Sequence, residues 1–241
     1  MRKRERQCIF YGIVVMALVT VAGCAKTGIT VTNNAITYVS LIHMAPYAPT
    51  TDVYLNGTLS SGAGGIPPGA FSAKYGGLKP GMYDFQFKKV GGDSLLADIP
   101  SSLYDTTNFY TLILFNPPGS QAAQALKIQD DFSTVSNFNT NYRFFHLAPD
   151  APAVDLYLSG TVAQPGRTDA DIVANNSYDV FQQVPAATYS LKAVLSSKPD
   201  SVLATLPATT MLAGGVYTFI LTETRSGLGN TYSINVLQAS Y

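Results

Sequence analysis

Two histidine–aspartate pairs are the residues of this chain whose types and spacing could carry chemistry. Asp52 follows His43 by nine positions, and Asp155 follows His146 at the same spacing. An imidazole close to a carboxylate can act as an acid–base dyad or supply ligands to a metal ion. The chain contains no other histidine, so any imidazole chemistry must use one of these two pairs.

Each pair lies in a segment that occurs twice in the chain. The first copy reads His43-Met-Ala-Pro-Tyr-Ala-Pro-Thr-Thr-Asp-Val-Tyr-Leu-Asn-Gly57, and residues 146–160 align with it without a gap. The positions of interest are His43, Pro46, Pro49, Asp52, Tyr54 and Gly57 in the first copy and His146, Pro149, Pro152, Asp155, Tyr157 and Gly160 in the second.

We interpret this segment as a structural motif. Proline fixes its own φ and biases the residue before it toward extended geometry, so the two Ala-Pro steps predict a stiff corner between two strands. Each imidazole then bonds to the corner backbone, and each aspartate accepts from turn N–H groups. A zinc site needs three or four protein ligands, and no third ligand is evident beside either histidine. We therefore expect no metal, no cofactor and no catalytic residue.

The motif resembles the domain of unknown function 4397 family, whose members are often exported bacterial proteins with tandem copies. The resemblance covers about residues 38–131 and 142–237. It implies a β-sandwich fold, and it implies no catalytic role for any residue of the motif.

Other catalytic or metal-binding patterns are weaker. No Gly-x-Ser-x-Gly segment accompanies the histidines, which disfavours a serine hydrolase. Glu223 is the only glutamate after Glu5, although paired carboxylates of a glycosidase remain possible from sequence. Asp130-Asp131 and the Asp169-Ala-Asp171 segment are interpreted as exposed acidic turns rather than a calcium site, because no EF-hand-like spacing follows them.

The N-terminus has the pattern of a bacterial lipoprotein signal peptide. Arg2 to Arg6 is basic, an apolar run follows from Ile9, and small residues precede Cys24. The apolar run is shorter than the roughly 20 residues of a spanning helix. We expect removal of residues 1–23 and lipidation of Cys24, which would hold the protein on a membrane. Ala25-Lys26 lacks an aspartate after the cysteine, a hint toward the outer membrane of a bacterial cell envelope. The sequence does not choose between its periplasmic and external faces.

The charge balance argues against nucleic acid as a partner. Removing residues 1–23 leaves 11 basic and 14 acidic residues, a net charge near −3. An acidic chain is not suited to a polyanionic ligand. With Cys8 removed and Cys24 lipidated, no disulfide is available, so packing alone must stabilise the fold.

The hydrophobic pattern predicts an all-β protein. Tyr83, Phe85 and Phe87 alternate with polar residues, and residues 109–115 form a nearly continuous run of apolar β-formers. About seven short strands per copy indicate two tandem antiparallel β-sandwich domains, immunoglobulin-like or transthyretin-like. The expected organisation is a tether over 24–35, a first module over 36–131, a linker over 132–141 and a second module over 142–241.

These features favour a lipid-anchored, non-enzymatic binding or structural protein of the cell envelope. Loops that differ between the copies, at residues 58–70 and 161–176, are expected to carry specificity. Tyr54 and Tyr157 are expected on the outward faces of their strands, where they would suit a glycan or an envelope-protein partner. The alternative is a carbohydrate-active or metal-dependent hydrolase that uses His146 and Asp155.

Overall fold

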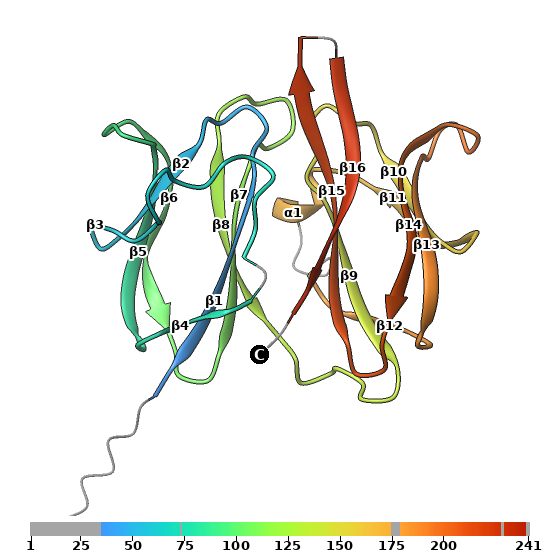
Figure 1. Ribbon diagram of the computed structural model, residues 1–241, viewed down its shortest axis with the longest axis horizontal. Helices are drawn as coiled ribbons and strands as arrows, with labels where there is room; N and C mark the ends of the chain where they lie inside the picture. The colour runs from blue at the N-terminus through green and yellow to red at the C-terminus, as the bar shows by residue number, and fades with distance from the viewer. Residues whose placement is uncertain (1–34, 73, 175–178, 228, 240–241) are drawn as a thin grey trace, which may run out of the picture. The chain divides into compact units, whose positions relative to one another are not determined.

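A computed structural model of the chain describes residues 35–72, 74–174, 179–227 and 229–239. The described part of the first module contains eight strands, about one more than the sequence pattern indicates (Figure 1). They are β1 (Thr37–Met44), β2 (Thr51–Leu55), β3 (Thr58–Leu59), β4 (Gly76–Leu78), β5 (Gly81–Lys89), β6 (Leu95–Tyr104), β7 (Phe109–Phe115) and β8 (Gln124–Asp130).

The second module repeats this order of strands and adds one short helix. Its elements are β9 (Thr140–His146), β10 (Val154–Leu158), β11 (Thr161–Arg167), α1 (Asp171–Ala174), β12 (Gln182–Val184), β13 (Ala187–Leu195), β14 (Val202–Met211), β15 (Val216–Ser226) and β16 (Gly229–Gln238). Strand β9 begins at Thr140, two residues before the expected start of the second module.

Each module is a sandwich of two four-stranded sheets, which confirms the predicted fold class. The orders are β4-β1-β7-β8 and β3-β2-β5-β6 in the first module, and β12-β9-β15-β16 and β11-β10-β13-β14 in the second. We call the sheets that contain β1 and β9 the inner sheets and the other two the outer sheets. The antiparallel expectation holds for every described strand pair except β1 with β7 and β9 with β15, which are parallel. Parallel pairing is possible there because a long crossover connects the two strands.

Each sandwich has its own apolar core, built from alternate residues of its strands. In the first module Phe85 and Phe87 of β5 and Leu112 and Leu114 of β7 point into it. Phe144 on β9 is among the residues that fill the corresponding core of the second module.

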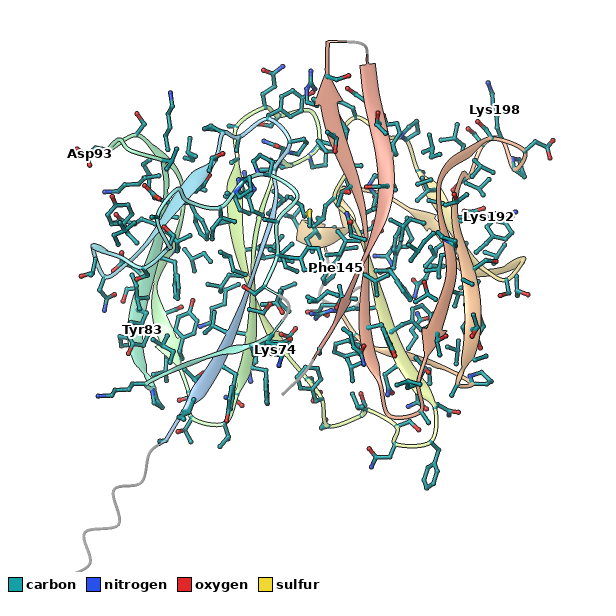
Figure 2. The ribbon with its side chains drawn as sticks, in the orientation of Figure 1. Lys74, Tyr83, Asp93, Phe145, Lys192 and Lys198 are labelled. Carbon is teal, nitrogen blue, oxygen red and sulfur yellow. The ribbon has the colours of Figure 1, made fainter. Side chains whose placement is uncertain are left out.

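A third apolar cluster joins the two inner sheets. It consists of Ile42, Met44, Ile113, Phe115 and Ile128 from the first module and Phe145, Leu147, Ile220 and Leu237 from the second. Figure 2 shows Phe145 in this region, between the two modules. The strands β7 and β9 are therefore covered on both faces, which is why their burial is nearly continuous.

The third cluster is built from equivalent positions of the two modules. The strand registers place His43 opposite Leu114 and His146 opposite Leu221, which fixes the equivalence of the inner sheets. On this basis Ile42 matches Phe145, Met44 matches Leu147, Ile113 matches Ile220 and Ile128 matches Leu237. Contact between the same patch on two units is the geometry of an isologous interface, here formed inside one chain.

A buried ion pair also crosses this interface. The Arg143 guanidinium, 1% exposed, bonds to the Asp130 carboxylate and to the hydroxyls of Thr111 and Thr218. The second carboxylate oxygen of Asp130 accepts from Tyr75 and Thr111. The interpretation of Asp130 as part of an exposed acidic turn is therefore wrong, because the second module covers it.

Candidate functional site

The repeated motif begins with a turn at the end of the first strand of each module. The Ala48 N–H donates to the Ala45 carbonyl over 3.1 Å, and the Ala151 N–H donates to the Ala148 carbonyl over 3.1 Å. Proline suits the position after the first turn residue because its φ is already near the required value. We call residues 43–52 the first corner and residues 146–155 the second corner.

His43 ties the two ends of the first corner together. Its Nδ1 accepts from the Ala45 N–H at 3.4 Å, so Nε2 carries the proton and contacts the Pro49 carbonyl at 3.3 Å. The same Nε2 lies 3.2 Å from the Thr51 hydroxyl oxygen. The residue is 1% exposed, and this burial lowers the pKa of the imidazole, so the ring is neutral at pH 7.

His146 occupies the same place in the second corner with fewer contacts. Its Nε2 bonds to the Pro152 carbonyl at 3.2 Å, the counterpart of the bond to Pro49. Its buried Nδ1 has no hydrogen-bond partner among the described residues, and Val154 stands where the first corner has Thr51. Burial lowers the pKa of His146 as well.

The two aspartates bond to loops rather than to the histidines. Asp52 accepts from the Ser61 hydroxyl at 3.1 Å and from the Gly91 N–H at 3.2 Å. Asp155 accepts from the Ser196 hydroxyl at 2.6 Å and from the Gly166 N–H at 2.7 Å. Strand alternation places each aspartate on the face of β2 or β10 that points away from the sandwich core. The described contacts therefore contain neither of the His–Asp dyads.

The end of the motif is a tight hairpin turn. Asn56 and Gly57 have φ values of 47° and 75°, and Ser159 and Gly160 have φ values of 46° and 88°. Two successive positive φ values define the turn that joins twisted antiparallel strands most readily, and glycine adopts the second without strain. The glycine of the motif is explained by this turn.

The motif tyrosines lie half-buried on the outer sheets. The Lys88 ammonium stands over the Tyr54 ring, 4.5 Å from its centroid. Tyr157 pairs in register with Lys192, which Figure 2 shows on the outer side of the second module.

The two corners meet at a polar cluster between the modules. Tyr47 and Asp150 occupy the same position of the motif, and the Tyr47 hydroxyl lies 2.8 Å from both carboxylate oxygens of Asp150. Arg225 and Asn230 also donate to Asp150, at 2.8 and 3.0 Å. The Arg225 guanidinium stacks on the Tyr47 ring at 3.8 Å from its centroid. Burial tends to raise the pKa of Asp150, but these hydrogen bonds outweigh it and hold the pKa below its ordinary value.

Glu223 is the counterpart of Asn116, and the two residues hold their corners in the same way. The side-chain Oδ1 of Asn116 accepts from the Tyr47 N–H at 3.1 Å, and Glu223 Oε2 accepts from the Asp150 N–H at 3.0 Å. The other polar atom of Asn116 is satisfied by the Gln121 carbonyl. Glu223 Oε1, by contrast, is buried without a hydrogen-bond partner and lies 3.9 Å from Arg225. Burial raises the pKa of the Glu223 carboxyl.

A partly open cleft of about 340 Å³ lies beside this cluster. One wall is apolar and comes from the first corner and the loop after β3, and the other is polar and comes from β15 and β16. The lining residues are Met44, Pro46, Pro68 and Gly69 on the first wall and Thr222, Glu223, Thr224, Arg225, Ser233 and Asn235 on the second. We call this space the inter-module cleft.

The sequence analysis did not identify this cleft. Tyr47, Asp150, Asn116 and Glu223 come from positions where the two copies differ, and their contacts join residues about 70 to 100 positions apart. The available signal was the single glutamate after the N-terminal segment, at a position that is asparagine in the first copy. Pro68 and Gly69 of the loop at residues 58–70 lie in the cleft wall, and a role of this loop in specificity stays a prediction.

The remaining candidates of the sequence analysis have other places. Asp171 bonds to Arg167 and to Thr168 at the start of α1, so its carboxylate closes that turn.

Within the described residues, no group of three or more His, Cys, Asp or Glu side chains is arranged to hold a metal ion. None of the helical segments in this part of the chain has the length and apolar character that crossing a membrane requires. Cys24 and the expected signal peptide lie outside the described residues.

The fold and the corners define a class of protein: two β-sandwiches that carry the same proline-braced, histidine-tied corner. A comparison with protein families places the chain more narrowly. The model of the domain of unknown function DUF4397 matches residues 37–157, which is half of the 241 residues. The chain therefore belongs to the DUF4397 family, as the motif predicted.

The matched span covers the first module and ends at Tyr157 in the second. A separate second copy of the family domain stays a prediction from the repeated motif. A comparison with curated proteins finds no match.

Proposed function

We propose that this protein is a lipid-anchored protein of the bacterial cell envelope whose two joined sandwiches act as a non-enzymatic binding module. The observation that carries the proposal is the use of the motif side chains. Both imidazole nitrogens of His43 are hydrogen-bonded to the corner backbone or to a neighbouring hydroxyl. The Asp52 carboxylate is hydrogen-bonded to two loops. Side chains with these roles stabilise a surface rather than perform chemistry on it.

The inter-module cleft supports a binding role, because the first corner and a neighbouring loop form one of its walls. Loops and turns that project from a rigid sandwich are the usual carriers of recognition. Here the first corner and the loop at residues 58–70 form one wall, and two strands of the other module form the opposite wall. The partner proposed is a glycan or another envelope protein.

Anchoring is supported by the sequence of the N-terminus alone. The basic start, the short apolar run and the small residues before Cys24 form the pattern of a processed lipoprotein. Several acyl chains on one cysteine, each gaining about 0.8 kcal/mol per buried CH₂, would make the attachment stable. The proposed location is the outer membrane, on either face.

The alternative hydrolase would require His146 and Asp155 to work together. A general base must lie within hydrogen-bond reach of the group it serves or orients. The carboxylate of Asp155 is instead bonded to Ser196 and Gly166, and His146 bonds to Pro152.

Two experiments test the proposal. Labelling of growing cells with a palmitate analogue should mark the wild-type protein in the membrane fraction, and Cys24→Ser should lose both the label and the membrane association. Purified full-length protein should show no turnover of glycoside or ester substrates. Hydrolysis that is lost in folded Asp155→Asn and His146→Ala variants, with folding checked by circular dichroism, would overturn the non-enzymatic assignment.

A further inference from the structure

We propose that the inter-module cleft binds a neutral saccharide of one or two rings, with Glu223 Oε1 accepting a hydrogen bond from a sugar hydroxyl. This inference rests on the proposed function, because it specifies the ligand class of that binding module. It is argued from an unsatisfied polar atom, from the chemistry of the two walls and from the charge of the cluster.

The unsatisfied atom is Glu223 Oε1. A buried polar atom without a partner is destabilising, and such atoms in native proteins call for a specific explanation. The equivalent residue of the first module, Asn116, makes the same corner contact without leaving an unsatisfied atom, because both polar atoms of its side chain have hydrogen-bond partners. The glutamate keeps the corner contact through Oε2 and leaves Oε1 buried without a hydrogen-bond partner, and Glu223 is one of the residues that line the cleft.

A second difference between the modules lies in the wall of the cleft. Phe115 fills the third apolar cluster, but its counterpart in β15 is Thr222, which lines the cleft. Thr222 accepts from the Asn235 amide at 2.8 Å and lies 3.0 Å from the Ser233 hydroxyl. A polar, hydrogen-bonded wall therefore stands where the symmetric position carries an aromatic ring.

The two walls match the two sides of a sugar ring. Pro46 and Pro68, with the buried Met44 behind them, offer an apolar surface against which the C–H face of a pyranose can pack. The opposite wall offers hydroxyl, amide, carboxyl and guanidinium groups to the sugar hydroxyls. A volume of about 340 Å³ is at the low end of the range of about 300–1,000 Å³ for small-molecule sites, which limits the ligand to a small saccharide.

The mixed charges of the cluster disfavour small anions and small cations. An anion would meet the carboxylates of Glu223 and Asp150, and an ammonium group would meet the Arg225 guanidinium, whose Nη1 is 3.9 Å from Glu223 Oε1. A hydroxyl donates and accepts, so it satisfies Oε1 whether the carboxyl is ionised or protonated. Burial raises the pKa of Glu223, and a hydroxyl ligand is compatible with that shift.

The test is a titration of the full-length protein, purified in detergent, monitored by saturation-transfer NMR. The neutral probes are glucose, N-acetylglucosamine, maltose, cellobiose and chitobiose, and the charged probes of matched size are glucosamine and glucose 6-phosphate. We expect at least one neutral probe to bind with a Kd of roughly 10 mM or tighter, and the charged probes to bind at least several-fold more weakly.

Two cleft variants and one control locate the site. Thr222→Phe installs the residue of the symmetric position and should abolish binding by filling the cleft. Glu223→Gln replaces the carboxylate acceptor by an N–H₂ donor while its oxygen keeps the Asp150 contact; a sugar hydroxyl can still accept from this group, but it loses a charged acceptor, so binding should weaken by roughly several-fold. Asp98→Asn removes one carboxylate from the exposed face of β6 and should leave the affinity unchanged. Thermal unfolding of each variant establishes that it is folded.

Failure of all five neutral probes to bind, tighter binding of a charged probe, or unchanged affinity in folded Thr222→Phe would overturn the inference. Two further results separate failure of the saccharide inference from failure of the proposed function. If envelope components cross-link equally to the wild-type and Thr222→Phe proteins, the protein still binds a partner and only the saccharide site is wrong. If the wild-type protein cleaves a probe, the non-enzymatic function is wrong.

Discussion

The two corners differ at the motif position next to the aspartate, which is Thr51 in the first corner and Val154 in the second. Thr51 places its hydroxyl oxygen 3.2 Å from His43 Nε2 and donates to the Pro49 carbonyl at 2.8 Å. Val154 has the same shape without the hydroxyl, and the second corner still forms with the single His146–Pro152 bond. The bond between histidine and the second proline carbonyl is therefore the common element, and the threonine adds to it.

Thr51→Val should lower the unfolding free energy by about 1 kcal/mol, the typical net value of one buried hydrogen bond. The reason is the loss of the hydroxyl contacts at a position where the second module already accepts valine. Chemical denaturation checks the value, and the symmetric Val154→Ala variant gives the cost of truncating the same site. An unchanged unfolding free energy in Thr51→Val would show that the threonine contributes nothing to the corner.

Stability should fall as the pH drops below about 6.5, the ordinary pKa of histidine. Both imidazoles have lowered pKa values in the folded protein because they are buried. The unfolded chain therefore binds more protons below pH 6.5, so the stabilisation is complete above that value and is lost as the pH falls toward the folded pKa values. Urea unfolding at pH 7.5 and 5.5 measures the effect. His146→Gln should reduce the difference, and an equal difference in that variant would contradict this origin.

At the scale of elements, the motif aspartates fix loops to strands. Asp155 holds the N–H of Gly166 in the β11 segment and the hydroxyl of Ser196 after β13. Asp52 makes the corresponding contacts with a serine and a glycine of the first module, although Ser61 and Gly91 come from different places in the fold. The carboxylate is thus used in the same way while the loops around it differ.

Asp155→Ala should loosen the β10–β11 hairpin and lower the unfolding free energy by about 1 kcal/mol, because the exposed Gly166 N–H and the half-buried Ser196 hydroxyl lose a charged acceptor. Hydrogen exchange should accelerate at the Gly166 amide and its neighbours. The amides of the first corner provide an internal control in the same molecule. Exchange that remains slow at Gly166 would contradict the role given to this carboxylate.

The strands were predictable because side-chain alternation is a local signal. Tyr83, Phe85 and Phe87 alternate with polar residues, and β5 buries that face in the first core. The interface between the modules was not predictable in the same way. The run at residues 109–115 indicated a buried strand, but only the fold reveals that Leu112 faces one core and Ile113 another. The inter-module cleft depends on contacts of this long-range kind, so its residues escaped the sequence analysis.

At the scale of the whole described chain, the two modules share one continuous set of contacts. The third apolar cluster and the buried Arg143–Asp130 pair lie between the inner sheets. The Arg143 guanidinium also lies 4.8 Å from the centroid of Phe145 and 4.7 Å from that of Phe181. Such an interface should make the modules unfold together, in contrast to two independent domains on a flexible linker.

Arg143→Ala should lower the unfolding free energy by about 3–5 kcal/mol, because it leaves the Asp130 carboxylate buried without its counter-ion. The double variant Arg143→Met with Asp130→Leu should recover much of that loss, since an apolar pair needs no desolvation. Denaturant titrations of Arg143→Met, Asp130→Leu and the double variant form the double-mutant cycle. A double variant that is as unstable as the sum of the single changes would show that the two charges do not stabilise each other.

The most direct test of the account is an NMR titration of the imidazoles. The chain contains only two histidines, so two sets of signals report on both corners. The account predicts that His43 is neutral at pH 7 with its proton on Nε2, and that each ring gains its second proton only below the ordinary pKa of 6.5. An imidazole that titrates at or above 6.5 in the folded protein, or that shifts on addition of a zinc ion, would contradict a structural role for the motif.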